Sequence, residues 1–198
     1  MTDPELSEAT ISDISQLIRQ RNLSPVELTQ ACIDRCERLD PTLQAFTTIT
    51  PEHALDRARQ AEDEIVRSAY RGPLHGIPYT LKDVIATHGI RTTFGNPRLV
   101  DFKPAESATV HVRLEEAGAV LLGKVYSHIG RGDNPVMCYS PWDPTTSPGT
   151  TSSGSASAVA SGMGLLSIGT DTGGSVRHPA SNCGLVGFKA TFGRISRF

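Results

Sequence analysis

The sequence lacks the features that define several classes of protein. Four cysteines in 198 residues are too few for a disulfide scaffold, and the first residues contain neither the basic segment nor the apolar core of a signal peptide. Nineteen lysines and arginines stand against 21 acidic residues, so the net charge of −2 gives no basic footprint for nucleic acid. We therefore expect a cytoplasmic protein with no membrane anchor and no nucleic-acid partner.

Charged side chains are also missing from a long internal stretch, between Asp143 and Asp171. Its length would suit a membrane span, but serine, threonine and glycine dominate and large apolar residues are few. A neutral segment of small residues is better explained by close backbone packing around a buried polar site.

Helices are predicted throughout residues 1–70. Thr10 is placed to cap the first one, ahead of apolar residues at helical spacing. Ser24 and Thr50 each precede a proline, which is favoured at the first position of a helix. These residues therefore predict an N-terminal helical segment.

From Gly72 onward, short apolar runs alternate with helical patterns and glycine turns. Alternation of this kind predicts an α/β fold, with a mixed sheet covered by helices. Strands are predicted at 76–81, 119–123 and 165–169, a helix capped by Ser107, and a further helix over 156–163.

Three motifs carry residues suited to nucleophilic chemistry. Lys82 lies in HGIPYTLKD, Ser152 lies in PGTTSSGSASA, and Ser175 lies in GTDTGGSVR. Alone, a lysine is usually a surface residue and a Gly/Ser run is usually a linker. Together, and in this order, the motifs resemble those of the amidase signature family of serine-dependent amide hydrolases. The resemblance extends from about residue 10 to the end of the sequence and implies the amidase-signature fold.

The resemblance implies a Ser-Ser-Lys relay that needs no metal and no cofactor. Ser175 would attack the amide carbonyl, Ser152 would pass a proton to the leaving amine, and Lys82 would be the terminal base. A lysine acts as a base near neutral pH only when its pKa falls below its usual value of about 10.4. The uncharged tract around Ser152 favours such a shift, whereas Asp83 and Asp171 would oppose it if they lay close.

The resemblance also assigns residues around this relay. Backbone N–H groups of a glycine-rich turn would form the oxyanion hole, because such donors can be aimed at the developing charge in advance. The turn residues are Thr172, Gly173 and Gly174. Supporting roles fall to Thr151, which keeps a hydroxyl within the site, and to Asp171 and Arg177, which are expected to pair and hold the turn.

Some positions depart from the family pattern. Thr150 and Ser153 stand where glycine is usual, so either would be strained if its φ angle were positive. The Thr151–Ser152 peptide bond is expected to be cis, at a cost of about 3–4 kcal/mol. The family's TNMxE segment is replaced by VYSHI at residues 125–129, which argues against a tRNA amidotransferase.

The family's domain extends well beyond the length of this chain. We therefore expect a truncated N-terminal part, with residues 1–70 as the helical segment and 71–198 as an incomplete catalytic domain. The predicted function is hydrolysis of a small-molecule amide to an acid and ammonia or an amine through an acyl-enzyme. Two alternatives stay open: a glutamine-dependent transamidase component, and an inactive fragment that needs its C-terminal half. A homodimer of the full-length parent is a candidate assembly.

Overall fold

The computed structural model describes residues 9–127 and 138–198. Within that part, no helix is both long enough and apolar enough to cross a membrane. The helices are α2 (Ile11–Arg19), α3 (Pro25–Leu43), α4 (Pro51–Val66), α5 (Thr109–Glu116), α6 (Ser153–Ala160) and α7 (Arg177–Asn182), with a 3-10 turn at Pro97–Leu99. The strands are β1 (Phe46–Ile49), β2 (Pro78–Lys82), β3 (Val120–Val125) and β4 (Leu166–Ile168).

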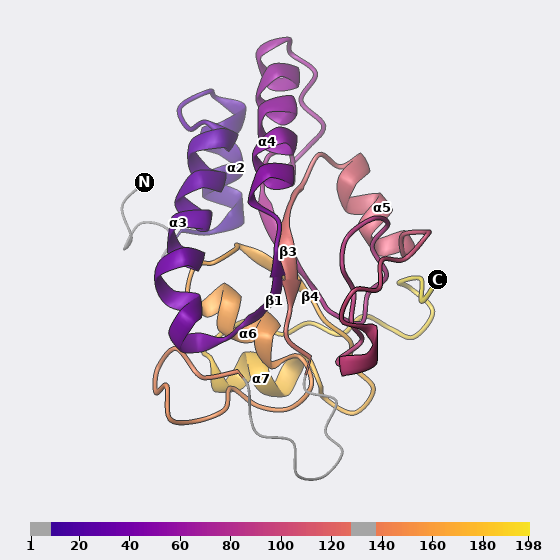
Figure 1. The fold of residues 1–198 in the computed structure, drawn as a ribbon. Coiled ribbons are helices and arrows are strands. Elements are labelled where there is room, and N and C mark those ends of the chain that lie inside the picture. Colours follow the sequence, from indigo (N-terminus) through magenta and orange to yellow (C-terminus); the bar gives the residue numbers. More distant parts are fainter. Residues whose placement is uncertain (1–8, 128–137) are drawn as a thin grey trace.

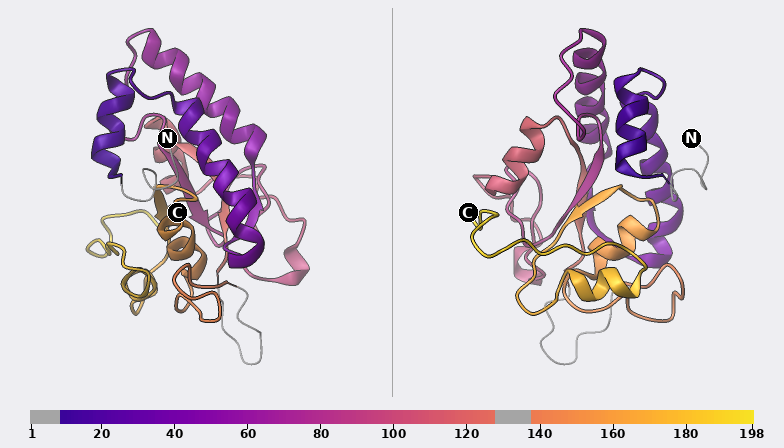
Figure 2. Two further views of the ribbon diagram at one scale, coloured as in Figure 1. Left: turned by 90° about the vertical axis from the view of Figure 1, so that its left-hand side faces the viewer. Right: turned by 180° about the vertical axis from the view of Figure 1, so that it is seen from behind.

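The strands form one sheet in the order β1-β3-β2-β4. β2 runs parallel to β3 and to β4, whereas β1 is antiparallel to β3, so the predicted α/β class with a mixed sheet is confirmed. The N-terminal helices α2, α3 and α4 stand together beside the sheet, α6 packs against one of its faces, and α7 lies below it in the view of Figure 1. The view from behind shows β4 on the side of α6 and α7 (Figure 2).

The predicted helix starts agree well with the structure. Thr10 Oγ1 accepts from Asp13 N, and Ser24 Oγ accepts from the backbone N–H groups of Val26 and Glu27. α4 begins at Pro51 as expected, although Thr50 makes no side-chain capping bond. Capping residues are readable from sequence because they act on groups two or three residues away.

Other predicted elements were wrong or incomplete. Ser107 does not cap α5; its hydroxyl accepts from His88 N, and the helix starts at Thr109. Only helices were predicted up to residue 70, so β1, which completes one edge of the sheet, was missed. The helix α7, which directly follows the glycine-rich turn, was missed as well.

Apolar side chains cover both faces of the sheet. On one face, Tyr79, Leu81 and Leu121 pack with Leu114 of α5. On the other, Val125 packs in a cluster with Ala158 of α6 and Met163, and neighbouring residues pack with α2, α3 and α4. Side chains alternate along a strand, so Lys82 projects to the face that α6 covers, opposite to Leu81.

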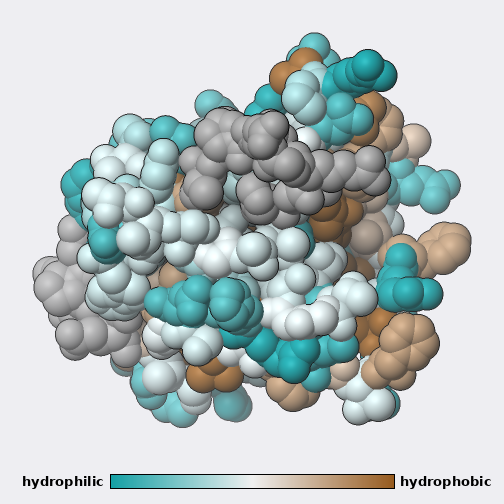
Figure 3. All heavy atoms as spheres, turned by 90° about the horizontal axis from the view of Figure 1, so that it is seen from below, coloured by the Kyte–Doolittle hydropathy of each residue, from teal (hydrophilic) through white to brown (hydrophobic). Residues whose placement is uncertain are grey.

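The segment after α7 leaves apolar side chains exposed. Its exposed residues include Val186, Phe188, Phe192 and Phe198, which are 98%, 78%, 82% and 91% accessible. The molecule seen from below carries hydrophobic surface along one side of that face (Figure 3). Exposed apolar surface of this kind is typical of regions that contact other protein.

Close packing at the start of α6 predicts a sharp effect of Gly154→Ala. A methyl group there would come within 2.4 Å of Tyr126 N and 2.6 Å of Ala45 O, both of which are backbone atoms that cannot move aside cheaply. Overpacking should lower the free energy of unfolding by about 1–3 kcal/mol, measured by urea denaturation. Gly173→Ala is the matched control, because its methyl group meets nothing within 4 Å. Equal stability of the two variants would contradict close packing at Gly154.

Candidate active site

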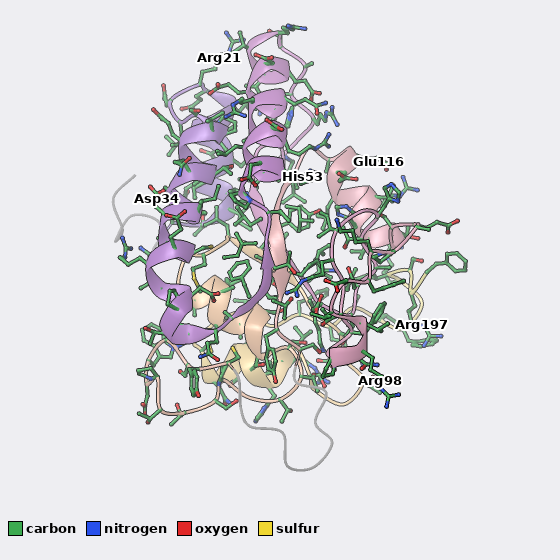
Figure 4. The ribbon with its side chains drawn as sticks, viewed as in Figure 1. Arg21, Asp34, His53, Arg98, Glu116 and Arg197 are labelled. Carbon is green, nitrogen blue, oxygen red and sulfur yellow. The ribbon has the colours of Figure 1, made fainter. Side chains whose placement is uncertain are left out.

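Lys82 lies at the carboxyl end of β2 and is only 2% exposed. Its ammonium donates to Thr170 Oγ1 at 2.8 Å. Burial lowers the pKa of Lys82 from its ordinary value to about 8, although the negative charge of Asp171 acts in the opposite direction. The charged residues that Figure 4 labels, among them Asp34 and Arg98, project instead from the outside of the molecule.

Ser152 occupies the N-cap position of α6 and is 1% exposed. Its Oγ lies 3.4 Å from both the backbone N and the backbone O of Thr170, so its polar contacts are long. Gly169 permits this approach, because a methyl group there would lie 2.7 Å from Ser152 Oγ. The neutral tract therefore does pack closely around a buried hydroxyl.

Ser175 lies in the turn that precedes α7 and is partly exposed. Its hydroxyl makes no hydrogen bond to any residue that the structure describes, and a direct hydrogen bond between Lys82 and Ser152 is likewise missing there. The structure thus brings Lys82 and Ser152 to a common neighbour, Thr170, and places Ser175 five residues further along the chain.

An ion pair organises the turn that carries Ser175. The carboxylate of Asp171 accepts from Arg177 Nε at 3.0 Å and also from the backbone N–H groups of Gly174 and Val176. Chiefly because of Arg177, the pKa of Asp171 lies well below its usual range. The two residues therefore pair across the turn.

The expected oxyanion donors differ in their availability. Gly174 N–H already donates to Asp171 Oδ1 at 2.8 Å. The N–H groups of Thr172, Gly173 and Ser175 make no hydrogen bond to the described residues. These three are free to meet a substrate oxygen, whereas Gly174 is engaged.

The backbone before α6 corrects one expectation. No peptide bond in residues 9–127 and 138–198 is cis, so the predicted cis bond before Ser152 was wrong. Thr151 instead has φ +60°, whereas Thr150 and Ser153 have ordinary negative angles. A left-handed residue turns the chain with a trans bond, which costs less than the about 3–4 kcal/mol of a non-proline cis bond. Thr151 Oγ1 is buried and has no partner among the described residues.

Sequence reasoning missed Thr170 as a site residue. Its hydroxyl accepts from Lys82 and its backbone flanks Ser152, so it touches both predicted members of the relay. Thr170 lies between Gly169 and Asp171 in the motif GTDTGGSVR, and that position was the available clue. The sequence alone does not show which groups a threonine hydroxyl contacts. Of the VYSHI segment, residues 128 and 129 lie outside the described part of the chain.

Comparisons with known proteins identify relatives of this chain. A family model described as Amidase matches residues 27–198. A glutamyl-tRNA(Gln) amidotransferase subunit from Chloroflexus aurantiacus is 43% identical over 98% of this chain and 41% of its own. The native peptide amidase from Stenotrophomonas maltophilia has a TM-score of 0.84 and 35% identity, over 90% of this chain and 39% of its own. A bacterial aryl acylamidase has a TM-score of 0.80 and 30% identity, over 87% and 37%.

The chain spans about two fifths of the length of the curated relatives it matches. Every similarity above therefore concerns one part of a longer relative.

The Asp171–Arg177 ion pair predicts a pH-dependent effect of Asp171→Asn. The folded-state pKa of Asp171 is lowered, so its stabilisation is complete above the unfolded pKa of about 3.9 and is lost as pH falls through the lower folded value. The variant should melt about 2–4 °C below the wild type at pH 7, and the difference should shrink below pH 4. Asp56→Asn, which removes an exposed surface partner of Arg59, is the control and should change little. A difference independent of pH would rule out the ionised carboxylate as its source.

Proposed function

Because this chain belongs to the Amidase family, we propose that it supplies the nucleophilic part of a site that hydrolyses a carboxylic amide to an acid and ammonia or an amine. The observation that carries the proposal is the burial of Lys82, whose pKa is about 8. Lys82 lies beside Thr170, which also contacts Ser152. An amine with that pKa is partly neutral near pH 7 and can accept a proton.

The proposed reaction begins with attack of Ser175 Oγ on the amide carbonyl carbon. The serine proton passes through Ser152 to Lys82, and the carbonyl oxygen becomes an oxyanion. The carbon–nitrogen bond then breaks as Ser152 delivers a proton to the leaving nitrogen. Water hydrolyses the resulting ester of Ser175 and regenerates the hydroxyl.

The relay would close by a movement of the Lys82 amine at Thr170. In the structure the Lys82 ammonium donates to Thr170 Oγ1, and Ser152 lies against the backbone of that same threonine. A shift of the amine from Thr170 to Ser152 would connect the base to the nucleophile's partner. The oxyanion would be held by the free N–H groups of the turn, which are those of Thr172, Gly173 and Ser175.

Ser175 is the residue on which the proposal can be tested directly. A fluorophosphonate reagent should form one covalent adduct with the wild-type chain, located by mass spectrometry at Ser175, and Ser175→Ala should abolish it. Lys82→Met should slow labelling by at least tenfold, because the hydroxyl loses its terminal base. Ser181→Ala, which removes an exposed serine of α7, is the matched control and should label normally.

The outcomes separate the remaining assignments. An adduct that survives Ser175→Ala would overturn the nucleophile assignment. Loss of labelling in Thr151→Val but not in Ser152→Ala would move the relay to the buried, unpartnered hydroxyl of Thr151. A folded wild-type chain that does not label would favour the alternative in which this part needs its C-terminal half. The exposed apolar residues after α7 favour the same alternative.

A role as the glutamine-dependent component of a transamidase is the second candidate function. The 43% identity to the glutamyl-tRNA(Gln) amidotransferase relative favours this function. The VYSHI segment, which departs from the family's TNMxE, argues against it. A homodimer of the full-length parent and a cytoplasmic location stay predictions.

The two functions predict different requirements for substrate. An amidase should release ammonia or an amine from simple carboxylic amides without any partner. A transamidase should release ammonia from glutamine, copurify with other proteins of its complex, and transfer that ammonia to a misacylated tRNA. Ammonia release measured with glutamine and with a panel of simple amides, with and without glutamyl-tRNA, distinguishes them. Turnover of simple amides unaffected by tRNA would exclude the second function.

A further inference from the structure

A second lysine is buried in the sheet, and the proposed reaction does not use it. Lys124 of β3 is 0% exposed. Its ammonium donates to Ile85 O, to Thr87 Oγ1 at 3.1 Å and to Thr92 Oγ1 at 2.8 Å. All three acceptors belong to one loop, which follows β2 and the candidate base Lys82.

The three acceptors match a protonated amine. An ammonium has three N–H donors, and each of them has a partner here. The hydroxyl protons of the two threonines are already donated elsewhere, from Thr87 to Ile85 O and from Thr92 to Ile90 O. Both hydroxyl oxygens are therefore left to accept, and a neutral amine could not satisfy all three.

Lys82 differs from Lys124 in both face and partners. Lys124 is paired in register with Leu81, whereas Lys82 is paired with Val125, so the two lysines project to opposite faces of the sheet. Lys82 has one hydroxyl acceptor, and Asp171 is the carboxylate that raises its pKa. Burial lowers the pKa of Lys124 to about 8 as well, and the negative charge of Asp83 acts in the opposite direction.

The loop held by Lys124 is closed at the residue next to Lys82. The Asp83 carboxylate accepts from Thr93 N at 3.2 Å and from the Thr93 hydroxyl, and Asp83 O accepts from Phe94 N. Asp83 N in turn donates to Val125 O on β3. Hydrogen bonds between Asp83 and Thr93 thus close the two ends of the loop, and Lys124 binds its interior.

We propose that Lys124 is a positioning residue for Lys82. Its ammonium fixes the loop from Asp83 to Thr93, and the closed neck of that loop holds the end of β2 in the buried place that Lys82 needs. The role rests on the proposed function of Lys82 as a base. Lys124 itself touches neither Ser152 nor Ser175 within the described residues, so it acts through the loop and not on the substrate.

The test is the ionisation of Lys82, followed by NMR of the chain labelled with ¹³C-lysine. The chain has only four lysines, so the side-chain signals are few and can be assigned by substitution. The wild-type Lys82 signal should titrate near pH 8. Lys124→Met removes the three donors, which frees the loop and admits water to the end of β2. The Lys82 midpoint should then rise by about 2 pH units, toward the value of about 10.4 for a solvated lysine.

Two further variants keep the test decisive. Thr92→Val removes one acceptor at nearly constant shape and should raise the Lys82 midpoint by a smaller amount; it serves also if Lys124→Met does not fold, as judged by circular dichroism. Lys103→Met replaces an exposed lysine and should leave the midpoint unchanged. A folded Lys124→Met or Thr92→Val chain whose Lys82 midpoint equals that of the wild type would overturn the proposal. Because the measurement needs no turnover, this result stays separate from a failure of Ser175 to label.

Discussion

A lysine at the end of a buried strand must give up its water shell, and that loss penalises its charged form. In place of that water, Lys82 has one neutral hydrogen-bond acceptor, the hydroxyl of Thr170. Among the described residues, no carboxylate lies within hydrogen-bonding distance of its amine. The balance leaves the amine able to gain and lose a proton near neutral pH. The site depends on this imbalance, which exists only because β4 runs beside β2 and delivers Thr170 to the end of the strand.

Small residues make that delivery possible. Gly169 lets Ser152 Oγ lie against the backbone, and Gly154 lets the first turn of α6 approach Tyr126. A methyl group at either position would meet atoms closer than 3 Å. The scarcity of charge and bulk in this tract is therefore a packing requirement of the site. Because residues 144–170 carry no charged side chain, the tract itself adds no charge near Lys82.

The charge that the site does contain is kept to one side. Asp171 uses its carboxylate to bind Arg177 and backbone N–H groups of the turn. The ion pair with Arg177 weakens the effect of the Asp171 charge on the Lys82 pKa, and it shapes the turn that carries Ser175. On the opposite face of the sheet, Asp83 and Lys124 close a second loop. Each carboxylate thus organises one loop: Asp171 the turn before α7, and Asp83 the loop after β2.

Local signals and long-range contacts determined different parts of the structure. Sequence alone determined the helix starts at Thr10 and Ser24, the α/β class and the family motifs, because caps, periodicity and motifs act over a few residues. It could not determine the edge strand β1, whose four residues are stabilised by pairing with β3 far along the chain. Only the tertiary structure revealed that Thr170 lies between Lys82 and Ser152, and that Thr151 turns the chain with a trans bond. Those features depend on which backbone atoms meet across the sheet, and that is decided by packing between distant segments.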